Sequence, residues 1–264
     1  MDRPADVWAS GEEYEPFIGR WSRPVARDFV DWLDLPAGRR WLDAGCGTGA
    51  LSEAVVLGAS PSQVRGVDPS PEFAEYAQRR LGGDSVSFAV GDAQRLDAAD
   101  GSFDAVVSGL VLNFVPDWLG ALHEMRRVVG PGGAVAAYVW DYPGEMWLLK
   151  HFWDAAAELD PAAAQLHEGR RFDFCEPAEL ERRFSAAGLT GVTGRGLVVP
   201  TVFAGFEDYW TPFLGGQGPA PSYAQSLEPT RLDELRAHVA SRLPVSADGS
   251  IALTARAWAV RGVA

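Results

Sequence analysis

Residues 40–51 read Arg40-Trp41-Leu42-Asp43-Ala44-Gly45-Cys46-Gly47-Thr48-Gly49-Ala50-Leu51. The pattern predicts an apolar strand that runs into three closely spaced glycines, which open a helix. A second predicted strand, 64–68, then ends on a carboxylate, Asp68, about twenty residues after the glycines. This layout is typical of a nucleotide-binding βαβ unit and decides the fold class of the chain.

The glycines and Asp68 predict a nucleoside site. Gly45, Gly47 and Gly49 lack a Cβ, so their backbone can take turn conformations and let a ligand approach the main chain closely. Asp68, at the carboxyl end of its strand, is placed to accept hydrogen bonds from both hydroxyls of a ribose.

The spacing of the glycines favours a ligand without phosphates. Gly-x-Gly-x-Gly differs from the Gly-x-Gly-x-x-Gly arrangement that places a pyrophosphate at a helix amino terminus. Asp43, two residues before the first glycine, puts a carboxylate where it favours a cation. S-adenosylmethionine, with a ribose, an adenine, an ammonium and a sulfonium, fits better than a dinucleotide. An NAD-dependent oxidoreductase is therefore the less favoured alternative.

Two later strands agree with this interpretation. The third predicted strand, 86–91, is followed by Asp92 and Ala93, whose carboxylate and amide suit the amine and the ring of adenine. The fourth, 103–108, ends on small residues, where the methionine part of the ligand would lie.

At this level of detail the chain resembles the class I S-adenosylmethionine-dependent methyltransferases, and within them the methyltransferase type 11 group typified by ubiquinone and menaquinone C-methyltransferases. The resemblance covers about residues 12–140. It rests on five ordered segments: Leu42-Asp43-Ala44-Gly45-Cys46-Gly47-Thr48-Gly49, Gly66-Val67-Asp68-Pro69-Ser70, Gly91-Asp92-Ala93, Ser102-Phe103-Asp104-Ala105-Val106, and Glu124-Met125-Arg126-Arg127-Val128-Val129-Gly130-Pro131-Gly132-Gly133.

The resemblance also implies roles for individual residues. Gly45 and Gly47 are expected to line the methionine end, Asp68 to hold the ribose, and Asp92 and Ala93 to hold the adenine. The other candidate cofactor-binding residues lie in the glycine loop or near strand ends: Asp43, Cys46, Leu51, Pro69, Ser70, Gly91 and Ser108. Tyr14, Arg20 and Trp21 fall in a segment that resembles the family's amino-terminal lid; the alternative is a hydrophobic staple for the following helix.

The order of strands and helices predicts an α/β fold. Strands near 40–44, 64–68, 86–91, 103–108 and 133–140 alternate with helices near 50–57, 71–81 and 118–129. Such alternation favours a Rossmann-like, mostly parallel sheet with helices on both faces. Two further strands, 192–202 and 251–261, bring the sheet to seven, and the family implies an antiparallel edge there.

The predicted domain organisation has three parts. Residues 1–38 form an amino-terminal lid and helix, and 39–203 with 249–264 form the methyltransferase core. The segment 204–248 lies between the last two strands and is predicted to be a helical cap insertion over the substrate pocket, with a helix near 229–243.

Three residues are candidates for catalysis. The family often has histidine just after the fourth strand, but here the position holds Asn113, which can orient a substrate oxygen or cap the next helix. His151, in a predicted helix at 145–159, is either a structural histidine of a capping helix or a general base, and Asp141, after the fifth strand, is the second candidate base. The cysteines Cys46 and Cys175 are far apart in the sequence, so no metal site is predicted.

Composition limits the partners. The net charge is −13, with 36 acidic against 23 basic residues, and no basic run suggests a nucleic-acid partner. No apolar run approaches the length of a membrane span, so a cytoplasmic protein is expected. As its oligomeric state we expect a monomer or a homodimer. Aromatic residues after position 138 favour an apolar or aromatic small-molecule acceptor. A remaining alternative is a protein of this fold that binds the cofactor without methyl transfer, as a regulatory module or a cyclase.

Overall fold

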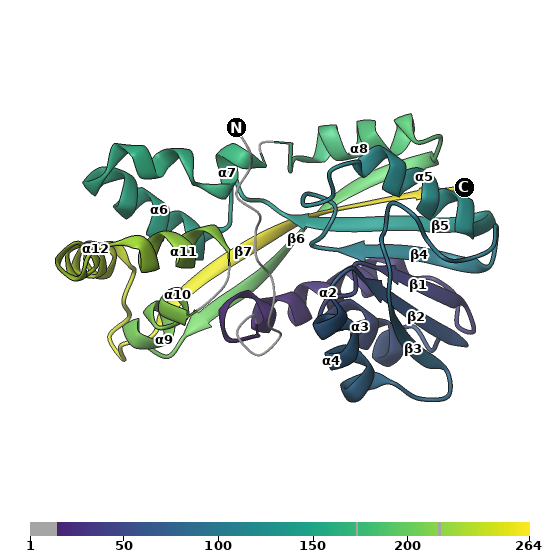
Figure 1. Cartoon of the computed structure of the whole chain (residues 1–264), viewed down its shortest axis with the longest axis horizontal. Helices are drawn as coiled ribbons and strands as arrows, with labels where there is room; N and C mark the ends of the chain where they lie inside the picture. The colour runs from purple at the N-terminus through teal and green to yellow at the C-terminus, as the bar shows by residue number, and fades with distance from the viewer. Residues whose placement is uncertain (1–14, 173, 216–217) are drawn as a thin grey trace. The chain divides into compact units, whose positions relative to one another are not determined.

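The computed structural model describes residues 15–172, 174–215 and 218–264. The chain forms two compact units (Figure 1). One, the sheet unit, contains 21–140, 174–197 and 257–264; the other, the helical unit, contains residues 15–20, 141–172 and most of 198–256. The segment 204–248 belongs to the helical unit together with 141–172, and its role as a cap stays a prediction.

Seven strands form one sheet in the order β3-β2-β1-β4-β5-β7-β6. Neighbours among the first five are parallel, whereas β7 runs antiparallel to β5. The mostly parallel sheet with an antiparallel strand near its edge is thereby confirmed. The strands span Arg40–Ala44 (β1), Gln63–Asp68 (β2), Val86–Val90 (β3), Phe103–Gly109 (β4), Val129–Trp140 (β5), Thr190–Phe203 (β6) and Ile251–Val263 (β7).

Helices cover both faces of the sheet, as predicted (Figure 1). On one face α3 (Ala50–Gly58) packs against α2 (Arg20–Leu33) and α4 (Pro71–Leu81), with Gly58 close to Val30 and Gly49 close to Ala77. On the other face lie α5 (Trp118–Val128) and α8 (Pro177–Ala186). This layering leaves the carboxyl ends of β1, β2, β3 and β4 as one continuous edge in the sheet unit.

The Gly-Pro-Gly-Gly segment differs from its prediction. We expected it to separate a helix from a strand beginning at 133, but β5 begins at Val129 and includes it. The pairing with β4 shifts there, from Phe103 opposite Val129 to Ala105 opposite Ala134. A Cβ on Gly133 would lie 2.8 Å from the Asp104 carbonyl oxygen, so glycine allows the irregular pairing of β5 with β4. The same glycines led us to predict an end of secondary structure at this place.

The helical unit is built around aromatic side chains. The rings of Phe152 and Phe213 stack with centroids 4.6 Å apart, and the Tyr209 hydroxyl donates to the Leu148 carbonyl at 2.6 Å. Its described helices are η1 (Glu15–Gly19), α6 (Trp147–Leu159), η2 (Pro161–Gln165), α7 (Glu168–Arg171), α9 (Phe206–Trp210), α10 (Pro212–Gly215), α11 (Pro219–Ser226) and α12 (Pro229–Arg242). We predicted α6 and α12 closely, but not the short helices, because their stability comes from aromatic packing rather than from local sequence.

Two features are absent from the described residues. No helix there combines the length and the apolar composition needed to cross a bilayer. Within the same part of the chain, no group of three or more His, Cys, Asp or Glu side chains is arranged to hold a metal ion.

Candidate cofactor-binding and active site

The three glycines after β1 have different surroundings. All have positive φ angles, of 82° at Gly45, 51° at Gly47 and 86° at Gly49. A Cβ on Gly45 would lie 2.6 Å from the Val111 side chain, and one on Gly49 would lie 2.8 Å from Leu81. A Cβ on Gly47 would have no heavy atom of the described chain within 4 Å. Gly45 and Gly49 are therefore required by packing, whereas Gly47 borders open space on the side where a ligand can approach.

Asp68 ties this loop to the end of β2. Its side chain is buried, with Oδ2 accepting from the Gly47 amide at 2.9 Å and Oδ1 accepting from the Ser70 amide at 2.9 Å. Burial raises the pKa of Asp68, and the two amide hydrogen bonds act in the opposite direction. Each carboxylate oxygen has a second lone pair, so Asp68 can hold the loop and still accept from a ribose hydroxyl.

Asp43 is the more deeply buried of the two acids, at 1% exposure. Its Oδ2 accepts from the Ser52 hydroxyl at 2.7 Å, while Oδ1 is buried without a hydrogen-bond partner in the described chain. Burial is the main reason that the pKa of Asp43 is raised to about 7. A buried carboxylate oxygen without a donor is costly, and a cation from a ligand would remove that cost.

After β3, Asp92 is positioned by its neighbour. Gln94 donates to Asp92 Oδ1 from its backbone amide at 2.8 Å and from its side-chain amide at 3.1 Å. The Gln94 side-chain oxygen accepts from the backbone amide of Asp117, the N-cap residue of α5. Ala93 is buried beside this exposed carboxylate. The arrangement keeps Asp92 at the strand edge, and its role toward adenine stays a prediction.

The end of β4 carries a strained turn and an unpaired amide. The hydroxyl of Ser108 donates to the Ala44 carbonyl at 2.7 Å, which joins β4 to β1. Leu110 has a φ of 63°, a conformation that costs a residue with a side chain energy. Asn113 is 7% exposed, yet neither its Nδ2 nor its Oδ1 has a partner among the described residues. A buried carboxamide with both atoms unpaired is rare in folded proteins, so the role of Asn113 toward an acceptor stays a prediction that this observation makes worth testing.

Comparison with known proteins gives the family. A sequence model of the methyltransferase domain family matches residues 42–137, from β1 to β5. Demethylmenaquinone methyltransferase of Staphylococcus aureus is 32% identical over 187 residues, which cover 66% of this chain and 76% of that protein. The chain belongs to the class I S-adenosylmethionine-dependent methyltransferases. It is a methyltransferase that uses S-adenosylmethionine as its methyl donor.

Solved structures agree on the fold of this methyltransferase. The YcgJ protein of Bacillus subtilis aligns with a TM-score of 0.57 at 19% identity, over 90% of this chain and 97% of that one. Phosphoethanolamine N-methyltransferase 2 of Haemonchus contortus, in complex with phosphomonomethylethanolamine and S-adenosylhomocysteine, aligns with a TM-score of 0.58 at 17% identity, over 96% and 56%.

The residues at the strand ends fit the methyl donor. The open side of Gly47 leaves room for a ligand against the main chain, and Asp68 can accept from the ribose. The unpaired Oδ1 of Asp43 suits a cationic group of the donor. We propose these three residues as the centre of the cofactor site.

The other residues predicted from the sequence to bind the cofactor differ in burial and in hydrogen bonding. Leu51 and Cys46 are buried, and burial raises the pKa of the Cys46 thiol well above its usual value, so it packs rather than reacts. Ser70 caps α4 by accepting from the Phe73 amide, and Pro69 beside it is exposed. The Gly91 amide donates to the Asp68 carbonyl at 3.0 Å.

The three residues predicted for the amino-terminal lid lie in different parts of the chain. Tyr14 lies outside the described residues. Arg20 belongs to the helical unit, where its guanidinium pairs with Asp208 at 2.8 Å and stacks over Phe203 at 4.7 Å. Trp21 is half-buried in α2 of the sheet unit. A role of these residues over the cofactor stays a prediction.

Both candidate bases lie in the helical unit. Asp141 is buried and accepts from the amides of Gly144 and Glu145 and from Arg256, at 2.7 Å for Nη2. His151 is half-buried in α6, beside Trp147 with ring centroids 5.9 Å apart. Burial is the main reason that its pKa is lowered, which keeps the imidazole neutral at pH 7. Asp141 therefore serves a local ion pair, whereas His151 retains the capacity to accept a proton.

Sequence analysis missed two residues of the site, Ser52 and Gln94. Ser52 is a polar residue at a fully buried position of α3, and a serine within the apolar stretch Ala50 to Val56 is the signal that could have found it. Gln94 carries no such signal, because its role depends on how the chain turns after Asp92.

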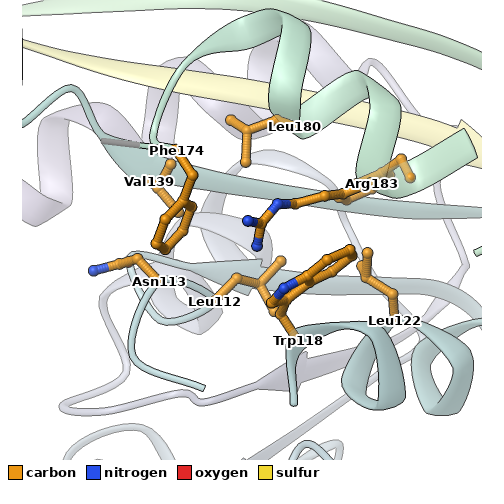
Figure 2. Close-up of a pocket in the computed structure, with 9 residues that line it drawn as sticks. Leu112, Asn113, Trp118, Leu122, Val139, Phe174, Leu180 and Arg183 are labelled. Carbon is orange, nitrogen blue, oxygen red and sulfur yellow. The ribbon is translucent and has the colours of Figure 1, made fainter. Parts of the chain in front are cut away.

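A small pocket lies between α5 and α8 (Figure 2). The side chains that line it pack closely and leave too little space for an acceptor molecule. The guanidinium of Arg183 lies between two rings, 4.0 Å from the Trp118 centroid and 4.3 Å from that of Phe174. Figure 2 shows the carboxamide nitrogen of Asn113 pointing away from Arg183. This cluster fixes α8 against α5.

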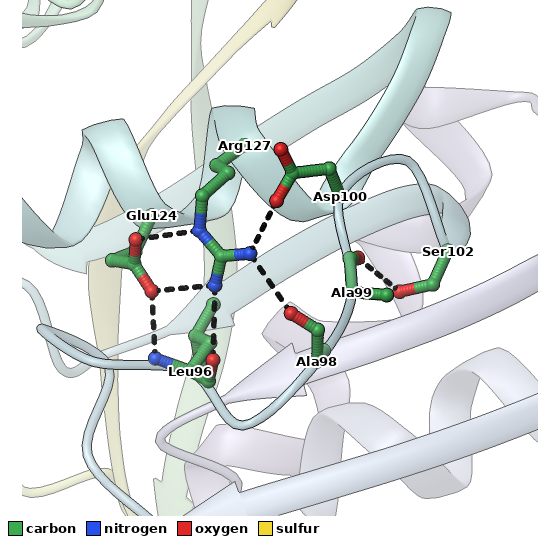
Figure 3. Close-up of polar contacts among 7 residues, drawn as sticks. All are labelled: Leu96, Ala98, Ala99, Asp100, Ser102, Glu124 and Arg127. Carbon is green, nitrogen blue, oxygen red and sulfur yellow. Dashed lines mark hydrogen bonds and ion pairs between the residues drawn. The ribbon is translucent and has the colours of Figure 1, made fainter.

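Arg127 of α5 holds the segment that follows Asp92 (Figure 3). Its guanidinium donates to Glu124 at 2.7 Å, to Asp100 at 2.7 Å, and to the carbonyls of Ala98 and Leu96 at 2.8 and 3.0 Å. Glu124 in turn accepts from the Leu96 amide at 2.9 Å. The segment from Leu96 to Asp100 is therefore held against α5 by side-chain hydrogen bonds.

We expect Arg127→Ala to lower the free energy of unfolding by about 1.5–3 kcal/mol, because it removes charge-assisted hydrogen bonds to Glu124 and to backbone carbonyls. Urea unfolding measures the loss, and amide exchange at Leu96 should accelerate. Arg231→Ala is the control, since the hydrogen-bonded ion pair of Arg231 with Glu234 is exposed and lies within one helix. Equal losses for the two variants would contradict the role given to Arg127.

Proposed function

We propose that this methyltransferase transfers the donor methyl group to a small apolar or aromatic molecule that carries a carbonyl or hydroxyl oxygen. The observation that carries the proposal is Asn113, a buried carboxamide four residues after the end of β4 that has no hydrogen-bond partner among the described residues. An acceptor oxygen bound by this amide would remove the cost of leaving it unpaired. Asn113 could then orient the acceptor.

Two further observations support this acceptor class. The part of the chain after β5 is rich in aromatic side chains, including Tyr142, Trp147 and Tyr223, which suit apolar rings. A relative at 32% identity is named for methylating demethylmenaquinone. Fold similarity alone does not fix the acceptor, so the proposal depends on Asn113 more than on the relative.

Catalysis in this proposal is mainly alignment. The bound donor supplies an electrophilic methyl group on a sulfonium, and the chain orients the acceptor and excludes water. A base is needed only when the acceptor atom is protonated. We propose His151 as that base, ahead of Asp141, whose carboxylate is already bound by Arg256. Replacing His151 with Gln should slow methyl transfer at pH 7 without changing affinity for S-adenosylhomocysteine, whereas His238→Gln, in an exposed contact with Glu158, should not.

The experiment uses methyl-labelled S-adenosylmethionine with a panel of phenols and hydroxyquinones, and mass spectrometry of the products. We expect label on at least one aromatic acceptor. Asn113→Leu should then lower kcat/KM for that acceptor by about tenfold or more, because one hydrogen-bonded oxygen loses its partner. Affinity for S-adenosylhomocysteine should stay unchanged.

Two results would contradict the proposal. Unlabelled products across the panel, with label found on an aliphatic acceptor instead, would exclude the aromatic class. An Asn113→Leu enzyme with undiminished kcat/KM would remove Asn113 from the acceptor site. Leu112→Ala is the matched control, since Leu112 is a buried neighbour without a polar side chain.

A further inference from the structure

Asp43 and Ser52 form a buried polar pair that links β1 to α3. Ser52 is 0% exposed, and its hydroxyl donates to Asp43 Oδ2 at 2.7 Å. The other carboxylate oxygen, Oδ1, is buried and has no partner in the described chain. One oxygen of Asp43 is thus fixed by the protein, and the second is left for something else.

No cation of the described chain compensates the charge of Asp43. The groups that act on its carboxylate are the Ser52 hydroxyl, the Ser52 backbone, and the carboxylate of Asp68, which disfavours a second negative charge nearby. The Cys46 thiol also faces both acids, and burial beside them keeps it protonated. Burial holds the pKa of Asp43 at about 7, so the free protein carries a mixture of ionised and protonated Asp43 at neutral pH.

We propose that Ser52 is a positioning residue that keeps Asp43 oriented with one oxygen free, and that binding of the cationic methyl donor drives a proton off Asp43. The inference rests on donor binding at the glycine loop. The Ser52 hydrogen bond stabilises the ionised carboxylate, and a cationic group of the donor compensates the remaining charge. Donor binding and ionisation of Asp43 therefore favour each other.

The first test is calorimetric titration with S-adenosylhomocysteine in buffers of different ionisation enthalpy. At pH 7 we expect release of about half a proton per ligand bound, and less as the pH rises to 8, because Asp43 is then already ionised. S-adenosylmethionine is the second ligand. Release with both ligands assigns the effect to the ammonium group, and release with S-adenosylmethionine alone assigns it to the sulfonium; either result supports the proposal.

The second test follows the pH dependence of affinity in variants. Affinity for the ligand should fall as the pH drops and Asp43 becomes protonated. In Ser52→Ala, the loss of the hydroxyl should move the midpoint of this fall to higher pH by about one unit. Ser52→Thr keeps a hydroxyl and should restore it. Ser185→Ala is the control, because it also removes a hydroxyl that donates a hydrogen bond, here to the Glu181 carbonyl within α8, and has no role in the proposed site. In Asp43→Asn, ligand affinity should lose the pH dependence whose midpoint Ser52→Ala shifts, because the side chain at position 43 no longer titrates.

Clear outcomes separate this inference from the proposed function. Tight ligand binding without buffer-dependent proton release would overturn the linkage, and equal midpoints in Ser52→Ala and wild type would overturn the role of Ser52. Neither result would affect the acceptor class, which depends on Asn113. Thermal unfolding of each variant shows that it is folded before its affinity is interpreted.

Discussion

Asp68→Asn should weaken binding of S-adenosylhomocysteine on the order of a hundredfold to a thousandfold, since a carboxylate that accepts from two ribose hydroxyls is lost. The amide cannot replace it, because one of its two terminal atoms is a donor, whereas in the structure both oxygens of Asp68 accept from backbone amides of Gly47 and Ser70. The change therefore disturbs the loop and the ribose site together.

A double comparison separates these two effects. Adenosine and its 2′-deoxy analogue, titrated against wild type and Asp68→Asn, give the coupling between the hydroxyl and the carboxylate. We expect the analogue to bind more weakly than adenosine in wild type and about equally in the variant. Asp104→Asn is the matched control, because Asp104 also accepts from a backbone amide, that of Arg40, but at the amino end of β4. A preference for adenosine that survives in Asp68→Asn would contradict ribose binding by Asp68.

Gly47→Ala should weaken S-adenosylhomocysteine on the order of a hundredfold, because its new Cβ enters the open space that we assign to the ligand. The backbone contributes as well, since Gly47 has a φ of 51°, which strains a residue with a Cβ. Isothermal titration measures the affinity, and thermal unfolding measures the strain.

Gly38 provides a matched control for Gly47. It has a φ of 79°, and a Cβ added there would also have no neighbour within 4 Å in the described chain. However, it precedes β1, at the opposite end of the strand from the glycine loop. Gly38→Ala should show comparable strain with unchanged affinity. Equal loss of affinity in the two variants, or no loss in Gly47→Ala, would contradict the claim that the ligand lies against Gly47.

Much of the sheet unit could be predicted from the sequence because its signals are local. The helix 71–81 begins with Ser70 as N-cap and a proline in the first turn, and α4 has the predicted bounds. Asp68 ends β2 and Asp92 follows the end of β3, so their place at one edge of the sheet follows from the parallel topology. These residues needed no knowledge of long-range packing.

Other features depend on contacts between distant parts of the chain. The sequence could not show that Asp141 is bound by Arg256, 115 residues away, which lowers its value as a base candidate. Nor could it show that the Ser52 hydroxyl binds one oxygen of Asp43, or that the Asn113 carboxamide lacks a partner in the part of the chain that the structure describes. Periodicity reports which side chains are buried, but hydrogen-bond partners across the fold depend on tertiary geometry.

The central claim is that the methyl donor lies across the glycine loop between Asp43 and Asp68, with Asn113 left to the acceptor. A crystal structure of the complex with S-adenosylhomocysteine tests it most directly. We predict both ribose hydroxyls within hydrogen-bond distance of Asp68, the ammonium group on the side of Asp43 Oδ1, and the Asn113 carboxamide facing the sulfur across open space. A ribose held by other residues, with Asp68 bound only to Gly47 and Ser70 as it is here, would contradict the account.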